Sequence, residues 1–429
     1  MFSWLNGSKA KNRRTSRRHK LGQGLEGLEG RSMLAGVVDI SVSGGLLTLT
    51  GDALSNGVAV VGTGVPGQFN VIGVANVVGA GSGPDTAAPT TIRNAGAAPA
   101  AAVLVNGVTS IYANLGNGND QFAVTGATGA GYYGAGLLAE YAANTFAAPV
   151  VGAPVGSAAT LSGSITVLGG NGNDAVALLV NTPSVIAIDA GAGNDYVVVE
   201  QSATANLAIN TGAADTATLG SDRVRVRDTT VTSAIGVNTY NGSDIVDVFS
   251  STAAAIGINT GENGGTPGVG VNPLIPEAVR IIGVTSSSVA INTAGGNDQI
   301  IVFGPVAGFS TLPTNLGALA INSGEGGDLV QLQAIAIDYS LTVVTAGGND
   351  TLTADGVSVG LNAVIDTGAG IDTVSLNALL VQYYLYLYLG EGDDSAAISN
   401  SAAAIGYVFG QGGVDTYSAA GNTGITFYQ

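Results

Sequence analysis

Apolar residues alternate with polar or small residues in short segments along most of the chain. In "SVAINTAGGNDQIIVF" (288–303), Val289 and Ile291 precede a turn of small and polar residues, and Ile300 and Val302 follow it. A period of two indicates β-strands that bury one face. Within this unit the pattern never changes to the period of 3.6 that is typical of a helix.

The turn returns at nearly constant intervals, and an Asp closes it. The interval is 21 residues from Asp174 to Asp195 and 22, 22, 22 and 21 residues along the last five turns. Asp215 lies one residue early, and Gly265 stands where a further Asp is expected. The closing residues in the repeated context are Asp120, Asp174, Asp195, Asp244, Asp298, Asp328, Asp350, Asp372, Asp394 and Asp415.

Repeats of this length are typical of solenoids. We therefore predict an all-β fold, a right-handed parallel β-helix (β-solenoid), with roughly a dozen rungs of about 21–22 residues and loop insertions. Rungs that stack at about 4.8 Å give a rod on the order of 60 Å long.

The Gly two residues before each Asp is expected at a positive φ, where a Cβ is costly. The Asn that often stands between them tolerates the left-handed conformation. Both residue types therefore have a structural interpretation. The Gly residues are Gly118, Gly172, Gly193, Gly242, Gly296, Gly326, Gly348, Gly370, Gly392 and Gly413.

The pattern divides the chain into a basic segment, residues 1–35, expected to be a disordered targeting segment, and a solenoid domain, residues 36–429. Within the solenoid, residues 36–110 form degenerate first rungs with a Gly51–Asp52 corner, and residues 111–421 form regular repeats. Insertions are expected at 73–106, 126–160, 266–278 and 304–316, and "AGLLAEYAANTF" in the second favours a short helix.

Charge is unevenly distributed. The 429 residues have a net charge of −17, but residues 1–31 hold eight Lys or Arg against two Glu, which leaves −23 on the remainder. Such an acidic body repels nucleic acid and anionic membranes and attracts cations. No apolar run reaches 18 residues, so no membrane span is expected, and the absence of Cys excludes disulfides and thiolate metal sites.

The repeated Asp is the candidate for chemistry. Stacked rungs place successive carboxylates about 5 Å apart, where each pair repels by roughly 0.8 kcal/mol in water and by more when buried. A hard cation with oxygen ligands would relieve this repulsion, and Ca²⁺ accepts carboxylate and carbonyl oxygens. The ten Asp residues are therefore predicted calcium ligands, and a metal-free, hydrogen-bonded Asp ladder is the alternative.

One turn carries a family resemblance. "GGNGNDAVA" (169–177) is similar to the nonapeptide G-G-x-G-x-D-x-U-x of the haemolysin-type (RTX) calcium-binding repeats, and "AGAGNDYVV", "LGNGNDQFA", "SGEGGDLVQ" and "LGEGDDSAA" are variants. The resemblance implies Ca²⁺ between stacked turns, bound by the Asp and by turn carbonyls. This chain has one such turn per rung instead of two, so calcium is expected along one edge only.

A second resemblance concerns the N-terminal segment. "GLEGLEGRSMLAG" is similar to the LEPR-XLL segment of large bacterial surface or secreted proteins, through Leu28, Glu29, Arg31, Met33 and Leu34, with Gly30 in place of the usual Pro. The resemblance implies an extracellular or cell-surface location in bacteria.

Two side-chain patterns predict contacts between rungs. Asn–Thr pairs before the turn (238–239, 259–260 and 292–293) predict ladders, with an ice-binding Thr face as the alternative. Arg223, Arg225 and Arg227 predict a basic stripe that neutralises acids of adjacent rungs.

Aromatic residues gather near the C-terminus. In "VQYYLYLYLG", the Leu residues occupy buried positions and the Tyr residues point outward, and the next rung repeats the pattern. We expect a stacked patch that serves as a sugar or partner platform or, preferably, is covered by the C-terminal "GITFYQ" as a cap. The patch comprises Tyr384, Tyr386, Tyr388, Tyr407 and Phe409.

The predicted function is that of a structural or adhesive extracellular protein that binds calcium, with surface polysaccharide or other cell-surface proteins as partners. The alternatives are a polysaccharide-active β-helix enzyme and a metal-free adhesin. Catalysis is disfavoured because residues 21–429 contain no Lys and no His, and Arg is a poor base.

Overall fold

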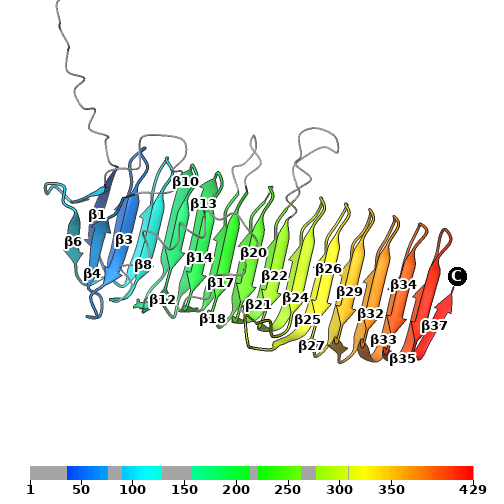
Figure 1. Cartoon of the computed structure of the whole chain (residues 1–429). Helices are drawn as coiled ribbons and strands as arrows, with labels where there is room; N and C mark the ends of the chain where they lie inside the picture. Colours follow the sequence, from blue (N-terminus) through cyan, green and yellow to red (C-terminus); the bar gives the residue numbers. More distant parts are fainter. Residues whose placement is uncertain are drawn as a thin grey trace, which may run out of the picture.

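The computed structural model describes residues 36–75, 89–127, 157–212, 221–240, 242–261, 277–307 and 309–428, and these residues form strands and turns without a helix. The described chain is all-β and has a solenoid-like architecture, in which two long sheets of parallel strands run side by side along a rod (Figure 1). The prediction of an all-β fold is therefore confirmed.

The first sheet, sheet A, has 22 strands and contains the segment before each Asp turn. Its long column pairs in the order β2 (Leu46–Thr50), β7 (Ser110–Asn114), β10 (Ile165–Asn171), β13 (Val185–Ala192), β16 (Asn206–Asn210), β19 (Ala234–Asn238), β21 (Thr252–Asn259), β23 (Thr285–Asn292), β25 (Thr314–Asn322), β28 (Ser340–Val344), β31 (Asn362–Asp366), β33 (Leu380–Tyr388), β35 (Ala402–Phe409) and β37 (Thr423–Tyr428). Shorter members are β1 (Val37–Ser43), β5 (Thr91–Asn94), β9 (Ala159–Thr160), β12 (Val180–Asn181), β15 (Ala203–Thr204), β18 (Thr230–Val231), β27 (Ile335–Ile337) and β30 (Ser358–Val359).

The second sheet, sheet B, has 15 strands and contains the segment after each Asp turn. In spatial order from the C-terminal end its strands are β36 (Thr416–Ala420), β34 (Ser395–Ser399), β32 (Thr373–Asn377), β29 (Thr351–Asp355), β26 (Leu329–Gln333), β24 (Gln299–Phe303), β22 (Ala278–Ile282), β20 (Ile245–Phe249), β17 (Arg223–Arg227), β14 (Tyr196–Glu200), β11 (Ala175–Leu178), β8 (Gln121–Thr125), β3 (Gly57–Gly62), β4 (Phe69–Gly73) and β6 (Ala102–Val105).

Alternation decides which residues form the core. In one rung, Leu341 and Val343 of β28 and Leu352 and Ala354 of β29 are at most 1% exposed, while the residues between them face outward. The same inward positions stack from rung to rung, so one hydrophobic core runs from Val38 to Val408. Burial of this continuous file is the main driving force for the fold.

The N-terminal end differs from the repeat. β1 and β2 form an antiparallel hairpin, and β4 pairs antiparallel with both β3 and β6. β1 also pairs parallel with β5, and the regular parallel stacking of both sheets begins where β7 lies on β2 and β8 lies on β3. The Asp52 carboxylate binds the amides of Val37 and Leu54 locally, and Asn56 takes the ladder position of this first rung.

Several expectations lie outside the described residues. These are the targeting segment 1–35, the helix in "AGLLAEYAANTF", Asp215, Gly265, and most of the insertions at 126–160 and 266–278. Most of the insertion at 304–316 is described, and its Phe309 ring meets the Phe249 ring edge to face at 5.6 Å.

The predicted Asn ladder is present, but the predicted ladder of Thr side chains is not, because the Thr hydroxyls bond to other groups. Nδ2 of Asn259, Asn292 and Asn322 each donates to Oδ1 of the Asn one rung earlier, at 2.7–3.0 Å. The Thr hydroxyls point into the rod: Thr293 donates to the carbonyl of Ser323, and Thr239, Thr260 and Thr293 are fully buried. An ice-binding Thr face is therefore excluded, because the Thr side chains lie on the inner side.

The Arg stripe pairs with acids of neighbouring rungs, as predicted. Arg225 lies 3.7 Å from Asp247, and Arg227 lies 3.2 Å from Glu200. Arg280 adds a bidentate pair with Asp247 at 2.7 Å. Three Arg side chains thus share two acids on the outer face of sheet B.

The aromatic patch is stacked, also as predicted. The Leu residues between the Tyr residues are fully buried, and Tyr386 stacks on Tyr407 at 5.8 Å between ring centroids. The C-terminal segment does not lie over these rings. It forms β37, which pairs with β35, and Tyr428 continues the stack on Phe409 at 5.3 Å.

Candidate functional site

The Asp corner joins a strand of sheet A to a strand of sheet B through a tight turn. Between β28 and β29 the chain passes from Thr345 to Asp350, and Gly348 has φ +129°. Nine of the ten predicted Gly residues have a positive φ. Gly326 and Gly370 flank Gly348 one rung away on either side and share this conformation.

A second position with a positive φ lies four residues before the Asp, which the sequence did not indicate. Gly fills it in several rungs, but Ala294, Ala346, Tyr240 and Gln411 adopt the same left-handed backbone. This conformation is energetically unfavourable for residues other than Gly. The stacked corner therefore dictates the backbone conformation even where the residue type opposes it.

Gly348→Ala should lower the free energy of unfolding by at least about 1–3 kcal/mol, because a Cβ there would collide with the carbonyl oxygen of Gly326 at a Gly-only φ. Gly295→Ala in a neighbouring turn is the matched control, since its Cβ would meet only the carbonyl of Glu325 at 3.7 Å. Urea unfolding of both variants provides the measurement. Equal stabilities would contradict the corner geometry.

The aspartates are lined up inside the corner. Oδ1 of each carboxyl group accepts a hydrogen bond from the backbone amide of the Asp one rung earlier, as Asp328 N–H donates to Asp350 Oδ1 at 2.8 Å. The same bond, at 2.6–3.1 Å, joins Asn56, Asp120, Asp174, Asp195, Asp222 and Asp244 in one run and Asp298, Asp328, Asp350, Asp372, Asp394 and Asp415 in another.

All ten predicted residues therefore occupy equivalent positions, and nine of them are at most 2% exposed. Asp415, in the last turn, is partly exposed. Three further residues at this corner were not indicated by the sequence. Asn56 begins the ladder and Asp222 continues it, whereas Glu277 takes the position of an Asp in the backbone pairing and its carboxylate accepts from the Thr260 hydroxyl.

The second carboxylate oxygen, Oδ2, has two kinds of surroundings. At Asp120, Asp174 and Asp394 it is buried without a hydrogen-bond partner, and the residue five positions earlier is Leu, Gly and Leu, respectively. At Asp328, Asp350 and Asp372, where that position holds Ser323, Thr345 and Thr367, Oδ2 is likewise buried without a hydrogen-bond partner, whereas Thr211 Oγ1 donates to Asp222 Oδ2 at 2.6 Å.

Two hydroxyls of this kind are used elsewhere. Thr345 lies beside Asp350, and Thr367 lies beside Asp372. The Thr345 hydroxyl donates to the carbonyl of Thr367, and the Thr367 hydroxyl donates to the carbonyl of Leu389. Both hydroxyl protons therefore point to carbonyl oxygens of the next rung. Each hydroxyl oxygen remains available to accept a hydrogen bond from Oδ2 when the carboxyl group is protonated.

Burial raises the pKa of these carboxyl groups. Loss of hydration raises the pKa of Asp120 to about 8 and, with the charges of Asp195 and Asp120, that of Asp174 to about 9. The same cause raises the pKa of Asp394 to about 6 and that of Glu277 to about 11. A buried file of like charges therefore requires either protons or a cation.

In several rungs the backbone amide of the residue before the Asp also donates to a side chain, that of the corresponding residue one rung earlier. Oδ1 of Asn173 accepts from the amide of Asn194, and Oδ1 of Asn349 accepts from the amide of Ile371 at 2.8 Å. Two rows of side chains, the Asp carboxylates and the side chains of the residues before them, thus accept hydrogen bonds from backbone amides of adjacent rungs. Buried amides without such partners would be strongly destabilising.

Calcium ligands can be tested against this geometry. No three acidic or His side chains in the described ranges come close enough together to hold an ion by themselves. The corner offers the unbonded Oδ2 atoms and the carbonyl oxygens of Gly326, Gly348 and Gly370, which point at the next rung where a Cβ would lie. Side-chain and carbonyl oxygens together are of the type that Ca²⁺ binds.

The fold and site therefore define a repeat protein of the all-β, solenoid-like class. Comparisons with family models, with curated proteins and with solved structures gave no match for this chain. Among the described residues, no helix is long and apolar enough to cross a membrane.

Proposed function

We propose that this chain is a structural or adhesive rod of the bacterial cell surface, a right-handed parallel β-helix of about a dozen rungs that binds calcium along its Asp corner. The observation that carries the proposal is the continuous file of carboxyl groups, each bound to the amide of the preceding rung. Such a file fixes the register of successive rungs, which suits a load-bearing rod better than a catalytic pocket.

Calcium would be held by Oδ2 of the predicted aspartates, together with turn carbonyls such as that of Gly348. The ion would supply positive charge to a file that otherwise consists of buried negative charges. This chain's own residues do the rest: the amides fix Oδ1, and the Gly residues bring the carbonyls close to the next rung.

A metal-free adhesin is the second candidate, and the raised pKa values of Asp120 and Asp174 favour it. In that case protons neutralise the ladder, and Oδ2 donates to the hydroxyl oxygen of residues such as Thr345. Both candidates share the rod and differ in what neutralises its corner.

Calorimetric titration of the metal-free chain with Ca²⁺ at pH 8 separates the two. The calcium-binding rod should give saturable heat and a higher melting temperature, both abolished by EDTA, whereas Mg²⁺ at equal concentration should have little effect because it prefers a rigid octahedral shell with bound waters. Absence of heat together with an unchanged melting temperature would exclude calcium and leave the metal-free adhesin.

A further inference from the structure

The outer face of sheet A is almost free of charge. From β16 to β37, the strands align three outward positions per rung, and Asp366 is the one charged residue among them. The outer face of sheet B carries Arg225, Asp247 and Arg280 between β17 and β22, and from β24 to β36 Asp355 is the one charged residue at its outward positions. In a chain with a net charge of −17, so few charges on the outer face of sheet A let a second acidic copy approach with little local repulsion.

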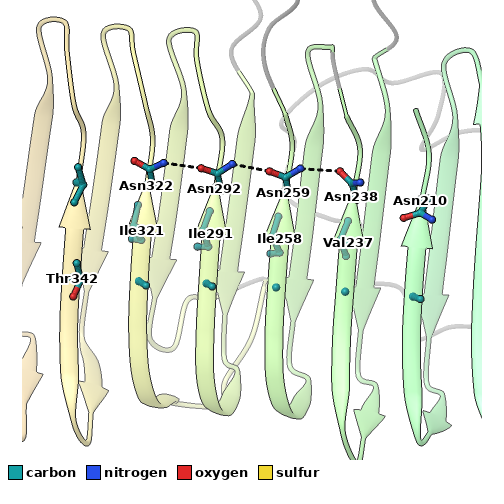
Figure 2. A pocket seen from close by; sticks show the side chains of 16 residues that line it. Asn210, Val237, Asn238, Ile258, Asn259, Ile291, Asn292, Ile321, Asn322 and Thr342 are labelled. Atoms are coloured by element: carbon teal, nitrogen blue, oxygen red, sulfur yellow. Dashed lines mark hydrogen bonds between the residues drawn. The ribbon is translucent and has the colours of Figure 1, made fainter. Parts of the chain in front are cut away.

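The N-terminal part of this face is hollow. A shallow trough of about 620 Å³ runs across the strands from β16 to β28, and the Asn ladder forms one of its sides (Figure 2). Its floor is aligned across the rungs and consists of Ala208, Gly236, Gly257, Ala290 and Ala320, all of which are exposed.

The fold itself does not require Gly in this floor. A Cβ on Gly236 or Gly257 would have no atom within 4 Å, and neither residue has a positive φ. Gly in a strand interior weakens the strand by roughly 0.5–1 kcal/mol relative to Ala and often marks the close approach of something else. Gly at these two positions leaves room for another surface to approach the strands closely.

The C-terminal part of the same face is raised. Tyr386, Tyr388, Tyr407, Phe409 and Tyr428 form a block of rings over β33, β35 and β37, with centroids 5.2–6.3 Å apart. Their faces stack mostly on one another, so the block presents mainly ring edges and hydroxyls. This arrangement suits insertion into a hollow better than stacking on a sugar ring.

Block and trough are placed so that a two-fold axis brings them together. Consider a two-fold axis that lies between β25 and β28 and runs parallel to these strands. Counted from β16, the tenth strand, β37, then faces β16 of the second copy, and the ninth strand, β35, faces β19. Tyr407 then faces Gly236, Tyr386 faces Gly257, and the Tyr388 hydroxyl faces the amide of Asn259. A self-complementary patch of this kind is what a two-fold interface requires.

The available area is sufficient. Ten strands that stack at about 4.8 Å, with five residues each at about 3.3 Å, cover on the order of 700 Å². A stable interface buries about 800 Å² per partner. Because specific interfaces range from about 600 to 1,000 Å² per partner, the face lies within that range, in its lower half, without any contribution from the corners.

We infer that two copies of this chain associate antiparallel through the outer face of sheet A, with the aromatic block of each copy lying in the Gly/Ala trough of the other. The inference is independent of whether the corner binds calcium. A second copy presents the same spacing between rungs, together with an aromatic block that matches the trough.

Analytical ultracentrifugation of the full chain, in calcium and in EDTA, tests the association with a matched pair of variants. The wild type should be a dimer, Ala290→Arg should be a monomer, and Ala397→Arg should remain a dimer, because Ala397 is an exposed Ala on the outer face of sheet B. Circular dichroism confirms that each variant is folded. A monomeric wild type, or a dimer that survives Ala290→Arg unchanged, would overturn the inference.

The chain has no Cys, so introduced thiols report geometry directly. The double variant Gly236→Cys with Tyr407→Cys should form disulfide-linked dimers on mild oxidation, and the pair Gly236→Cys with Ala397→Cys should not. Cross-linking of the second pair to the same extent, or failure of the first, would show that the antiparallel arrangement is wrong.

Discussion

The metal-free protein should melt at a higher temperature at pH 5 than at pH 8. The pKa of Asp120 is raised to about 8 and that of Asp174 to about 9, whereas an unfolded Asp titrates near 4. A group whose folded pKa is raised contributes stability that is complete below the unfolded pKa and is lost as the pH rises through the folded pKa. Between about pH 4 and pH 8, each such carboxyl lowers the free energy of unfolding by about 1.4 kcal/mol per pH unit.

Calcium should reverse this trend. At pH 8 protons compete with Ca²⁺ for these carboxyl oxygens about a thousandfold less than at pH 5, so Ca²⁺ should raise the melting temperature strongly at pH 8, while at pH 5 the gain should nearly vanish. Differential scanning calorimetry at both pH values, with and without Ca²⁺ after removal of metal on a chelating resin, gives the four values. A metal-free melting temperature that rises from pH 5 to pH 8 is the result that the ladder does not allow.

Asp350→Ala should cost about 1–3 kcal/mol of unfolding free energy, because the buried amide of Asp328 loses its acceptor. Asp350→Asn should behave differently. The Asn keeps an acceptor for Asp328 N–H, removes one buried charge, and places a donor beside the Thr345 hydroxyl. In metal-free protein at pH 8 this variant should be at least as stable as the wild type.

Asn349→Ala provides the control for this pair. Its side chain is exposed and accepts the amide of Ile371, which water can replace, so the loss should be small. Urea unfolding monitored by circular dichroism provides the comparison. If Asp350→Ala and Asn349→Ala lost equal stability, the buried ladder would not be the element that secures the rungs.

The repeat made the corner predictable from the sequence. Each turn repeats Gly and Asp at fixed distances, and each residue type has a physical reason to be there, so Gly348 and Asp350 could be placed before the structure was known. The alternation of Leu385 and Leu387 with Tyr386 and Tyr388 likewise fixed which side faces the core.

Other acidic residues of the corner could not be predicted from the sequence because insertions precede them. Asp222 and Glu277 follow irregular segments that interrupt the period, so counting from Asp195 and Asp244 does not reach them. The alternating segments after them, "RVRVR" and "AVRII", were the available signal. A change from Asp to Glu shifts the carboxyl group by one carbon, which a strict motif does not accommodate.

The sequence also indicates the N-terminal hairpin, which was not among the predictions. Gly44 and Gly45 separate two alternating segments, which is a strong signal of a two-residue β-hairpin. Both have a positive φ and connect β1 to β2. The trough on sheet A was beyond sequence analysis, because it depends on which residues of five rungs fall into register.

A crystal structure of the chain grown with and without calcium tests the central claim most directly. The account predicts that the carboxyl groups of Asp298, Asp328, Asp350, Asp372 and Asp394 form one buried file, in which each one from Asp328 onward accepts the amide of the preceding Asp, and that calcium adds density beside Oδ2 in that file. Aspartates that point separately into solvent in both crystals, with the amides bound elsewhere, would contradict it.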